Sequence, residues 1–121
     1  MIMPKQIILY NLRDDVKIED YIKWCHEFKG PLLLGLKSVK SFTLLKMIGG
    51  RKWNGQKGES PEETKSPFQC IGILDVTSRE EWMKDVASEA YQKDFFPKFF
   101  SNWGADTYAI VGDEVYHGES E

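Results

Sequence analysis

The segment at residues 6–12 carries apolar side chains on both faces of an extended strand. Ile7 and Leu9 fall on one face. Ile8 and Tyr10 fall on the other, because successive side chains of a strand point to opposite sides of its sheet. A strand with this pattern has both faces covered in the folded protein. The need to cover two apolar faces constrains the fold more than any other feature of the sequence.

Further segments alternate in the same way and are predicted to be strands, at residues 39–48, 68–76 and 106–116. With two helical segments between the strands, the order is β-α-β-β-α-β. This order predicts an α+β fold of the ferredoxin-like type, with an antiparallel sheet and both helices on one of its faces. Residues 1–121 are expected to form one domain. Since a single chain leaves the other sheet face bare and apolar, the pattern predicts a homodimer in which a second copy covers that face.

The first helix is predicted over residues 17–29. Apolar side chains recur there at three- and four-residue steps and form one stripe. Asp15 is the predicted N-cap, and Gly30 with Pro31 is expected to end the helix. A short helical turn is expected to follow over residues 32–36.

The second helix is predicted to begin at Thr77 or Ser78, because each has a glutamate three residues later, as a capping box requires. After a break near Ser88 the helix resumes and ends at Gly104. Its second half is apolar over too wide an arc for one sheet contact, so part of it is expected to line a cavity or to meet the partner chain. The candidate substrate-binding residues of this half are Phe95, Phe96, Phe99 and Trp103.

Residues 49–66 are rich in glycine, lysine and glutamate and have no hydrophobic period, which predicts a flexible loop. Trp53 in this loop is a candidate to close over a ligand pocket. The alternative is that Trp53 is simply exposed. The polar tail at residues 118–121 is expected to be loose.

The charge and cysteine content disfavour several classes of function. The net charge is −3 and no basic block is present, so nucleic acid is not an expected partner. No apolar run is long enough to span a membrane, and residues 1–5 have no signal-peptide core, which predicts a cytoplasmic protein. Cys25 and Cys70 stand far apart and are expected to be reduced thiols. His26 and His117 lack metal-ligand spacing, so no metal site is predicted.

The sequence DYIKWCHEFKGPL at residues 20–32 resembles the dimeric α+β barrel superfamily, and in particular its EthD-type domains. Those domains have an aromatic pair on the first helix, followed by His-Gly-Pro-Leu. Over its full length the chain is also similar to the RedY-like proteins encoded with prodigiosin-type tripyrrole pathways. The resemblance implies a small enzyme or accessory protein of antibiotic biosynthesis, without an organic cofactor. It would bind a flat, apolar, pyrrole- or polyketide-like intermediate between its sheet and its helices.

His26 and Lys29 are the candidate catalytic residues. Imidazole ordinarily exchanges a proton near neutral pH, which suits His26 to general acid or base chemistry. A half-exposed surface histidine is the alternative. Lys29 occupies the position where the EthD-type pattern has its histidine, and at a spacing of three it should project from roughly the same side of the helix as His26. The alternative for Lys29 is a C-terminal lysine that complements the helix dipole.

Asn11 and Trp24 complete the candidate binding residues. Asn11 interrupts the apolar pattern near the end of the first strand, where its amide could orient a carbonyl or a pyrrole N–H. Alternatively, Asn11 begins the turn that follows. Trp24 lies at the boundary of the apolar stripe of the first helix.

The sequence leaves three functions open. The first is a proton-transfer enzyme for a condensation, cyclisation or dehydration. The second is a non-catalytic binding or carrier protein for the same intermediate, which needs an aromatic pocket but no titrating group. The third is a cofactorless monooxygenase, as some barrels of the superfamily are.

Overall fold

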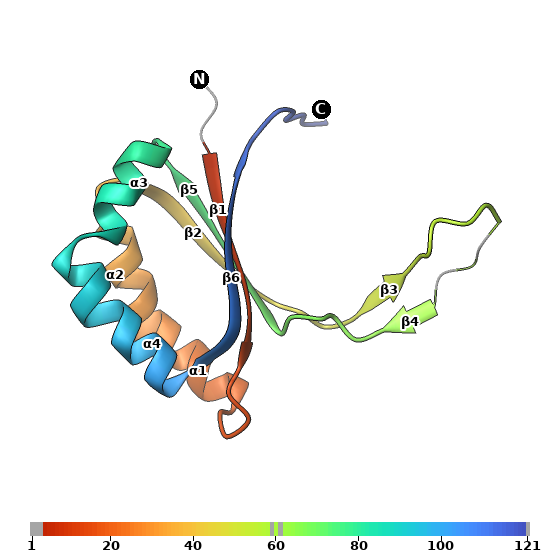
Figure 1. Cartoon of the computed structure of the whole chain (residues 1–121), viewed down its shortest axis with the longest axis horizontal. Helices are drawn as coiled ribbons and strands as arrows, with labels where there is room; N and C mark the ends of the chain where they lie inside the picture. The colour runs from red at the N-terminus through yellow and green to blue at the C-terminus, as the bar shows by residue number, and fades with distance from the viewer. Residues whose placement is uncertain (1–3, 59, 61, 121) are drawn as a thin grey trace.

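A computed structural model describes residues 4–58, 60 and 62–120. Its main sheet is four-stranded and antiparallel, with the strand order β2-β5-β1-β6. All the described helices lie on one face of this sheet, and no described helix covers the opposite face, which we call the bare face (Figure 1). The predicted ferredoxin-like α+β fold is therefore confirmed. The strands are β1 (Pro4–Leu12), β2 (Val39–Lys46), β5 (Cys70–Val76) and β6 (Gly104–Asp113).

The first helical segment continues beyond its predicted end. It comprises α1 (Ile18–Trp24), the π-helical η1 (Cys25–Lys29) and α2 (Gly30–Leu34). Pro31 lies in the first turn of α2, where a missing N–H costs nothing, so Gly30 and Pro31 do not end the helix as predicted. The prediction of Asp15 as N-cap was also wrong, because the helix begins after Lys17.

The second helical segment repeats this arrangement. It comprises α3 (Arg79–Val86), the π-helical η2 (Ala90–Phe95) and α4 (Phe96–Asn102), with Pro97 in the first turn of α4. The Ser78 hydroxyl accepts a hydrogen bond of 3.0 Å from the Glu81 backbone N–H, which confirms the predicted cap. Lys29 and Phe95 are thus the last residues of equivalent π-helical turns, a feature often found at functional sites.

Part of the predicted loop at residues 49–66 is regular. β3 (Gly50–Lys52) and β4 (Glu62–Thr64) pair in antiparallel register and form an arm that projects away from the body of the protein (Figure 1). Arg51 and Glu63 are cross-strand partners in the arm, and their side chains lie 3.6 Å apart. The prediction missed this hairpin because exposed polar strands have no hydrophobic period. Its flexibility stays a prediction, and residues 59 and 61 lie outside the described residues.

The last strand begins and ends earlier than predicted, at Gly104 and Asp113 rather than at residues 106 and 116. The register between β1 and β6 shifts between Leu9 and Asn11, where Asp106 has a φ of 45°. Such bulges bend a strand and increase its twist. Residues 114–120 after the strand have no regular structure. Residue 121 of the predicted loose tail lies outside the described residues.

The core lies between the sheet and the helices. Burial alternates along β5, with Leu74 and Val76 buried on the helix side and Ile71 and Ile73 half-buried on the other side. Both faces of the sheet are apolar, as the strand patterns predicted. No described helix has the length and hydropathy needed to cross a membrane.

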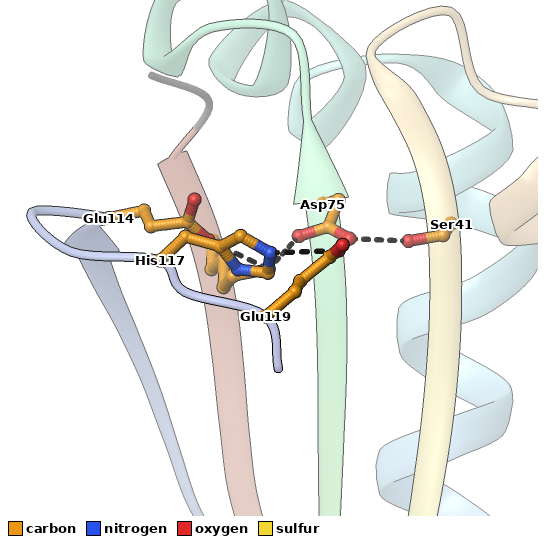
Figure 2. A network of polar contacts seen from close by, with 6 residues as sticks. Ser41, Asp75, Glu114, His117 and Glu119 are labelled. Carbon is orange, nitrogen blue, oxygen red and sulfur yellow. Dashed lines mark hydrogen bonds and ion pairs between the residues drawn. The ribbon is translucent and has the colours of Figure 1, made fainter. Parts of the chain in front are cut away.

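The bare face consists of cross-strand rows. One row is Leu45, Ile71, Leu9 and Tyr108, and the next is Thr43, Ile73, Ile7 and Ile110. The following row is polar, because the Asp75 carboxylate binds both the Lys5 ammonium and the Ser41 hydroxyl. Figure 2 shows this group together with Glu114, His117 and Glu119 from the segment after β6. The apolar rows of the bare face thus end at a row of polar and charged side chains.

Candidate active site

Lys29 is buried between the helices and the sheet, with 3 % of its surface exposed. Its ammonium Nζ donates a hydrogen bond of 2.8 Å to the Tyr21 hydroxyl and one of 3.2 Å to the Tyr10 hydroxyl. The two hydroxyl oxygens are 2.6 Å apart. Tyr21 comes from α1 and Tyr10 from β1, so the cluster joins a helix to the sheet.

The π-helical turn positions this lysine. The Gly30 N–H bonds to the Cys25 carbonyl, one residue further back than in an α-helix. A Cβ on residue 30 would lie 2.9 Å from that carbonyl oxygen, which is too close, so the turn requires glycine at this position. Lys29 lies four residues after the buried Cys25 and shares its inward side of the helical segment, whereas His26 is exposed.

Aromatic rings surround the Lys29 ammonium. Among the described residues no carboxylate lies within ion-pair distance of Nζ. The positive charge is therefore stabilised by two hydroxyls and by ring faces, since a cation within about 6 Å of a ring centroid is attracted to it. The centroids of Tyr10, Phe99, Tyr21, Phe42 and Phe95 lie 4.8, 5.0, 5.5, 5.5 and 5.8 Å from Nζ.

Burial controls the protonation of this cluster. It lowers the pKa of Lys29 from 10.5 to about 8, because the ammonium loses its hydration without gaining a carboxylate partner. Burial also raises the pKa of Tyr10 and of Tyr21 far above their usual range. It raises the pKa of the Cys25 thiol, and that of the Cys70 thiol to about 11. Of these groups, Lys29 is the one that exchanges a proton near neutral pH.

Lys29 lines a cavity of about 160 Å³ between the sheet and the helices, which we call the chamber. Phe42 from β2 and Ile8 from β1 form its sheet side. An apolar cavity of about 150 Å³ is known to hold benzene, so the chamber has room for one aromatic ring. Its aromatic wall consists of Tyr91, Phe95, Phe96, Phe99 and Phe100.

A second, larger cavity of about 510 Å³ lies between the first helical segment and β2, and we call it the groove. It is lined by apolar side chains, by His26 and by Lys46. Phe42 lines both the groove and the chamber. The Phe42 side chain therefore lies between the two cavities.

The structure brings some of the predicted site residues together. Lys29 lies in the chamber with Phe95, Phe96 and Phe99. The interpretation of Lys29 as a C-terminal lysine that complements the helix dipole was wrong, because the helical segment continues through α2 and the Lys29 side chain is buried. His26 and Lys29 do not share a cavity, since His26 is exposed and lines the groove.

The other predicted residues lie elsewhere. Trp24 and Trp103 pack against each other between the helices, with ring centroids 5.5 Å apart, and neither lines the chamber. The Asn11 amide accepts a hydrogen bond of 2.9 Å from the Gln69 backbone N–H, so it holds the segment before β5. Trp53 is 61 % exposed on the arm, which points away from the helices (Figure 1).

Sequence reasoning missed three residues of the site. Tyr10 was assigned to an apolar face of the first strand, Tyr21 lies in the apolar stripe of the helix predicted over residues 17–29, and Phe42 lies in the strand predicted at residues 39–48. A signal for the first two was present, because a buried tyrosine hydroxyl needs a hydrogen-bond partner. Two tyrosines on elements that face each other therefore implied a shared polar group between them.

The geometry defines an α+β domain of the ferredoxin-like class with an aromatic chamber that contains one buried amine. A family model described as "REDY-like protein HapK" matches residues 4–115, so the chain belongs to this family. No curated protein sequence matches the chain.

Solved structures share the fold. HapK from Hahella chejuensis is 14% identical, with a TM-score of 0.66 over 97% of this chain and 98% of that one. An EthD family protein from Bacillus halodurans is 12% identical, with a TM-score of 0.63 over 93% of this chain and 99% of that one. A dimeric ferredoxin-like protein from Thermobifida fusca is 13% identical, with a TM-score of 0.56 over 92% of this chain and 90% of that one.

Proposed function

We propose that the protein binds a flat aromatic intermediate of prodigiosin-like secondary metabolism and transfers a proton on it with Lys29. The observation that carries this proposal is the Lys29 amine, buried in an apolar chamber with two tyrosine hydroxyls as its hydrogen-bond acceptors. Membership of the REDY-like family supports the class of ligand. A single pyrrole or benzene ring matches the volume of the chamber.

The two hydroxyls orient the amine for this chemistry. Neutral Nζ has two hydrogens, which Tyr10 and Tyr21 accept, so its lone pair takes the remaining tetrahedral direction. The lone pair accepts a proton from an acidic C–H or N–H of the ligand. The ammonium that results stabilises the neighbouring ligand anion and returns the proton to another ligand atom. Such a transfer supports a condensation, a cyclisation or a dehydration.

His26 is the second catalytic candidate under this proposal. It is exposed and lines the groove, outside the chamber. Phe95, Phe96 and Phe99 would hold the ring in the chamber, and the rest of a larger ligand would extend past Phe42 into the groove.

A nitrobenzisoxazole tests the base without knowledge of the natural substrate. Removal of its C–H proton by a base breaks the N–O bond and releases a coloured phenolate. We expect turnover with a pH midpoint near 8. Lys29→Met should lower the rate by about 10²–10⁴-fold, and His26→Gln should affect it less.

The same assay can contradict the proposal. If the probe binds, as measured by quenching of protein fluorescence, but Lys29→Met converts it as fast as the native protein, Lys29 is not the base. A larger loss in His26→Gln would assign the base to His26. Binding without any turnover would favour the carrier function.

We also propose that the protein is a homodimer that pairs through the bare sheet face. On this face Tyr108 is 60 % exposed, Ile110 50 % and Leu45 40 %. A second copy would cover these apolar rows, which continue across four strands. The arm projects away from the helices (Figure 1) and would then extend toward the partner.

A further inference from the structure

The buried amine of Lys29 differs from every other lysine that the structure describes. Lys5 is half-buried, and the remaining lysines of the described ranges are exposed. A lysine without hydration and without a carboxylate partner is a nucleophile as well as a base. Lys29 thus has a reactivity that exposed lysines such as Lys46 lack.

We propose that Lys29 Nζ forms an imine with an aldehyde or ketone carried by an aromatic ring in the chamber. This inference rests on the proposed function, because it places the ligand ring in the same chamber. It goes further in naming the carbonyl as the reacting group of the ligand and in making the reaction covalent.

The contacts of Nζ support this step. The lone pair of the neutral amine is directed away from Tyr10 and Tyr21, since both hydroxyls accept its hydrogens. A ring flanked by Phe95 and Phe99 could place a carbonyl substituent next to Nζ, because both side chains line the chamber and lie within 5.8 Å and 5.0 Å of Nζ by ring centroid. No further co-reactant is needed.

The atoms balance as follows. The Nζ lone pair bonds to the carbonyl carbon, and the carbonyl π electrons move to its oxygen. The Tyr21 hydroxyl gives a proton to that oxygen and receives one from Nζ, which leaves a carbinolamine and an unchanged tyrosine. The C–O bond then breaks as the oxygen takes a second proton, again from the Tyr21 hydroxyl, and leaves as water. The nitrogen lone pair forms the C=N bond, and the last Nζ proton passes to Tyr21, which restores its hydroxyl.

Reductive trapping tests the proposal. The native protein is incubated at pH 7 with pyrrole-2-carboxaldehyde and cyanoborohydride, and the labelled lysine is located by peptide mass mapping. At this pH an amine with a pKa of about 8 has roughly 10²-fold more free base than an ordinary lysine. We therefore expect Lys29 to be labelled at least about tenfold faster than Lys46.

Four controls define the site. Lys29→Met should lose the fast label, and Lys40→Met, at an exposed lysine that lines neither the chamber nor the groove, should keep it. In guanidinium the preference for Lys29 should disappear, since the unfolded chain has no chamber. Tyr21→Phe should slow the label without abolishing binding of the ring, because it removes the proton relay.

Binding of 2-methylpyrrole, which has no carbonyl, separates the two proposals. If 2-methylpyrrole binds in the chamber but pyrrole-2-carboxaldehyde labels Lys29 no faster than Lys46, the imine proposal is wrong and the proposed function stands. If neither probe binds, both proposals are wrong. Fast labelling of Lys29, lost in Lys29→Met, supports the imine.

Discussion

Replacing Lys29 with methionine should stabilise the protein at neutral pH. Methionine has a similar length and needs no hydration, so it fits the same apolar site. The Lys29 pKa of about 8 in the folded protein lies below the ordinary value of 10.5. This pKa difference corresponds to about 3 kcal/mol of folding free energy, which is the cost of burying the ammonium. The loss of hydrogen bonds to Tyr10 and Tyr21 offsets part of the gain, so we expect Lys29→Met to be about 1–3 kcal/mol more stable at pH 7.

The sign of the pH dependence follows from the direction of the shift. Between pH 8 and 10.5 the unfolded chain binds the Lys29 proton and the folded chain releases it. The stability of the native protein therefore rises with pH relative to that of Lys29→Met. From pH 7 to pH 9 the advantage of the variant should shrink by about 1 kcal/mol. Both proteins contain the thiols of Cys25 and Cys70, whose titration largely cancels in the difference.

Urea unfolding followed by circular dichroism at pH 7, 8 and 9 measures the difference in stability between Lys29→Met and the native protein. It also measures how this difference changes with pH. Lys46→Met is the matched control, because Lys46 is exposed on the groove, and it should show neither effect. A Lys29→Met protein that is less stable than the native one at pH 7, by an amount that does not change with pH, would refute the reasoning. Such a result would mean that the tyrosine and ring contacts outweigh the cost of burying the charge.

Four further predictions concern the aromatic wall of the chamber, the π-helical turn, the bare sheet face and the arm. Phe99→Ala should cost about 3–5 kcal/mol in urea unfolding, whereas Phe100→Ala, at a residue that is 43 % exposed, should mainly weaken binding of 2-methylpyrrole. Gly30→Ala should distort η1 and slow nitrobenzisoxazole turnover, because its Cβ would meet the Cys25 carbonyl at 2.9 Å; unchanged turnover would contradict the role of the π-helical turn. Sedimentation should give a dimer of the 14.0 kDa chain that Ile110→Lys dissociates, and a native monomer would refute the pairing. Hydrogen exchange should be fastest at residues 49–66, and protection equal to that of β1 would contradict a flexible arm.

The order of strands and helices could be predicted from the sequence because it depends on local periodicity. Alternation in β1 and β5 and the apolar stripe through Tyr21 are properties of neighbouring residues, and they predicted a sheet that is apolar on both faces. The capping serine of α3 could be recognised for the same reason. Part of the site could also be predicted. The apolar side chains around Phe95 and Phe99 cover a wider arc of the helix than one contact with the sheet can bury.

The environment of Lys29 was decided by the tertiary structure. The spacing of three residues predicted that Lys29 and His26 project from roughly the same side of the helix, but Lys29 is buried and His26 is exposed. Its partners come from distant parts of the chain, with Tyr10 on β1, Phe42 on β2 and Phe99 on α4. No periodicity of the sequence specifies that these side chains meet around one amine. Their convergence follows from the packing of helices on the sheet, and it is this packing that removes water from Lys29 and lowers its pKa.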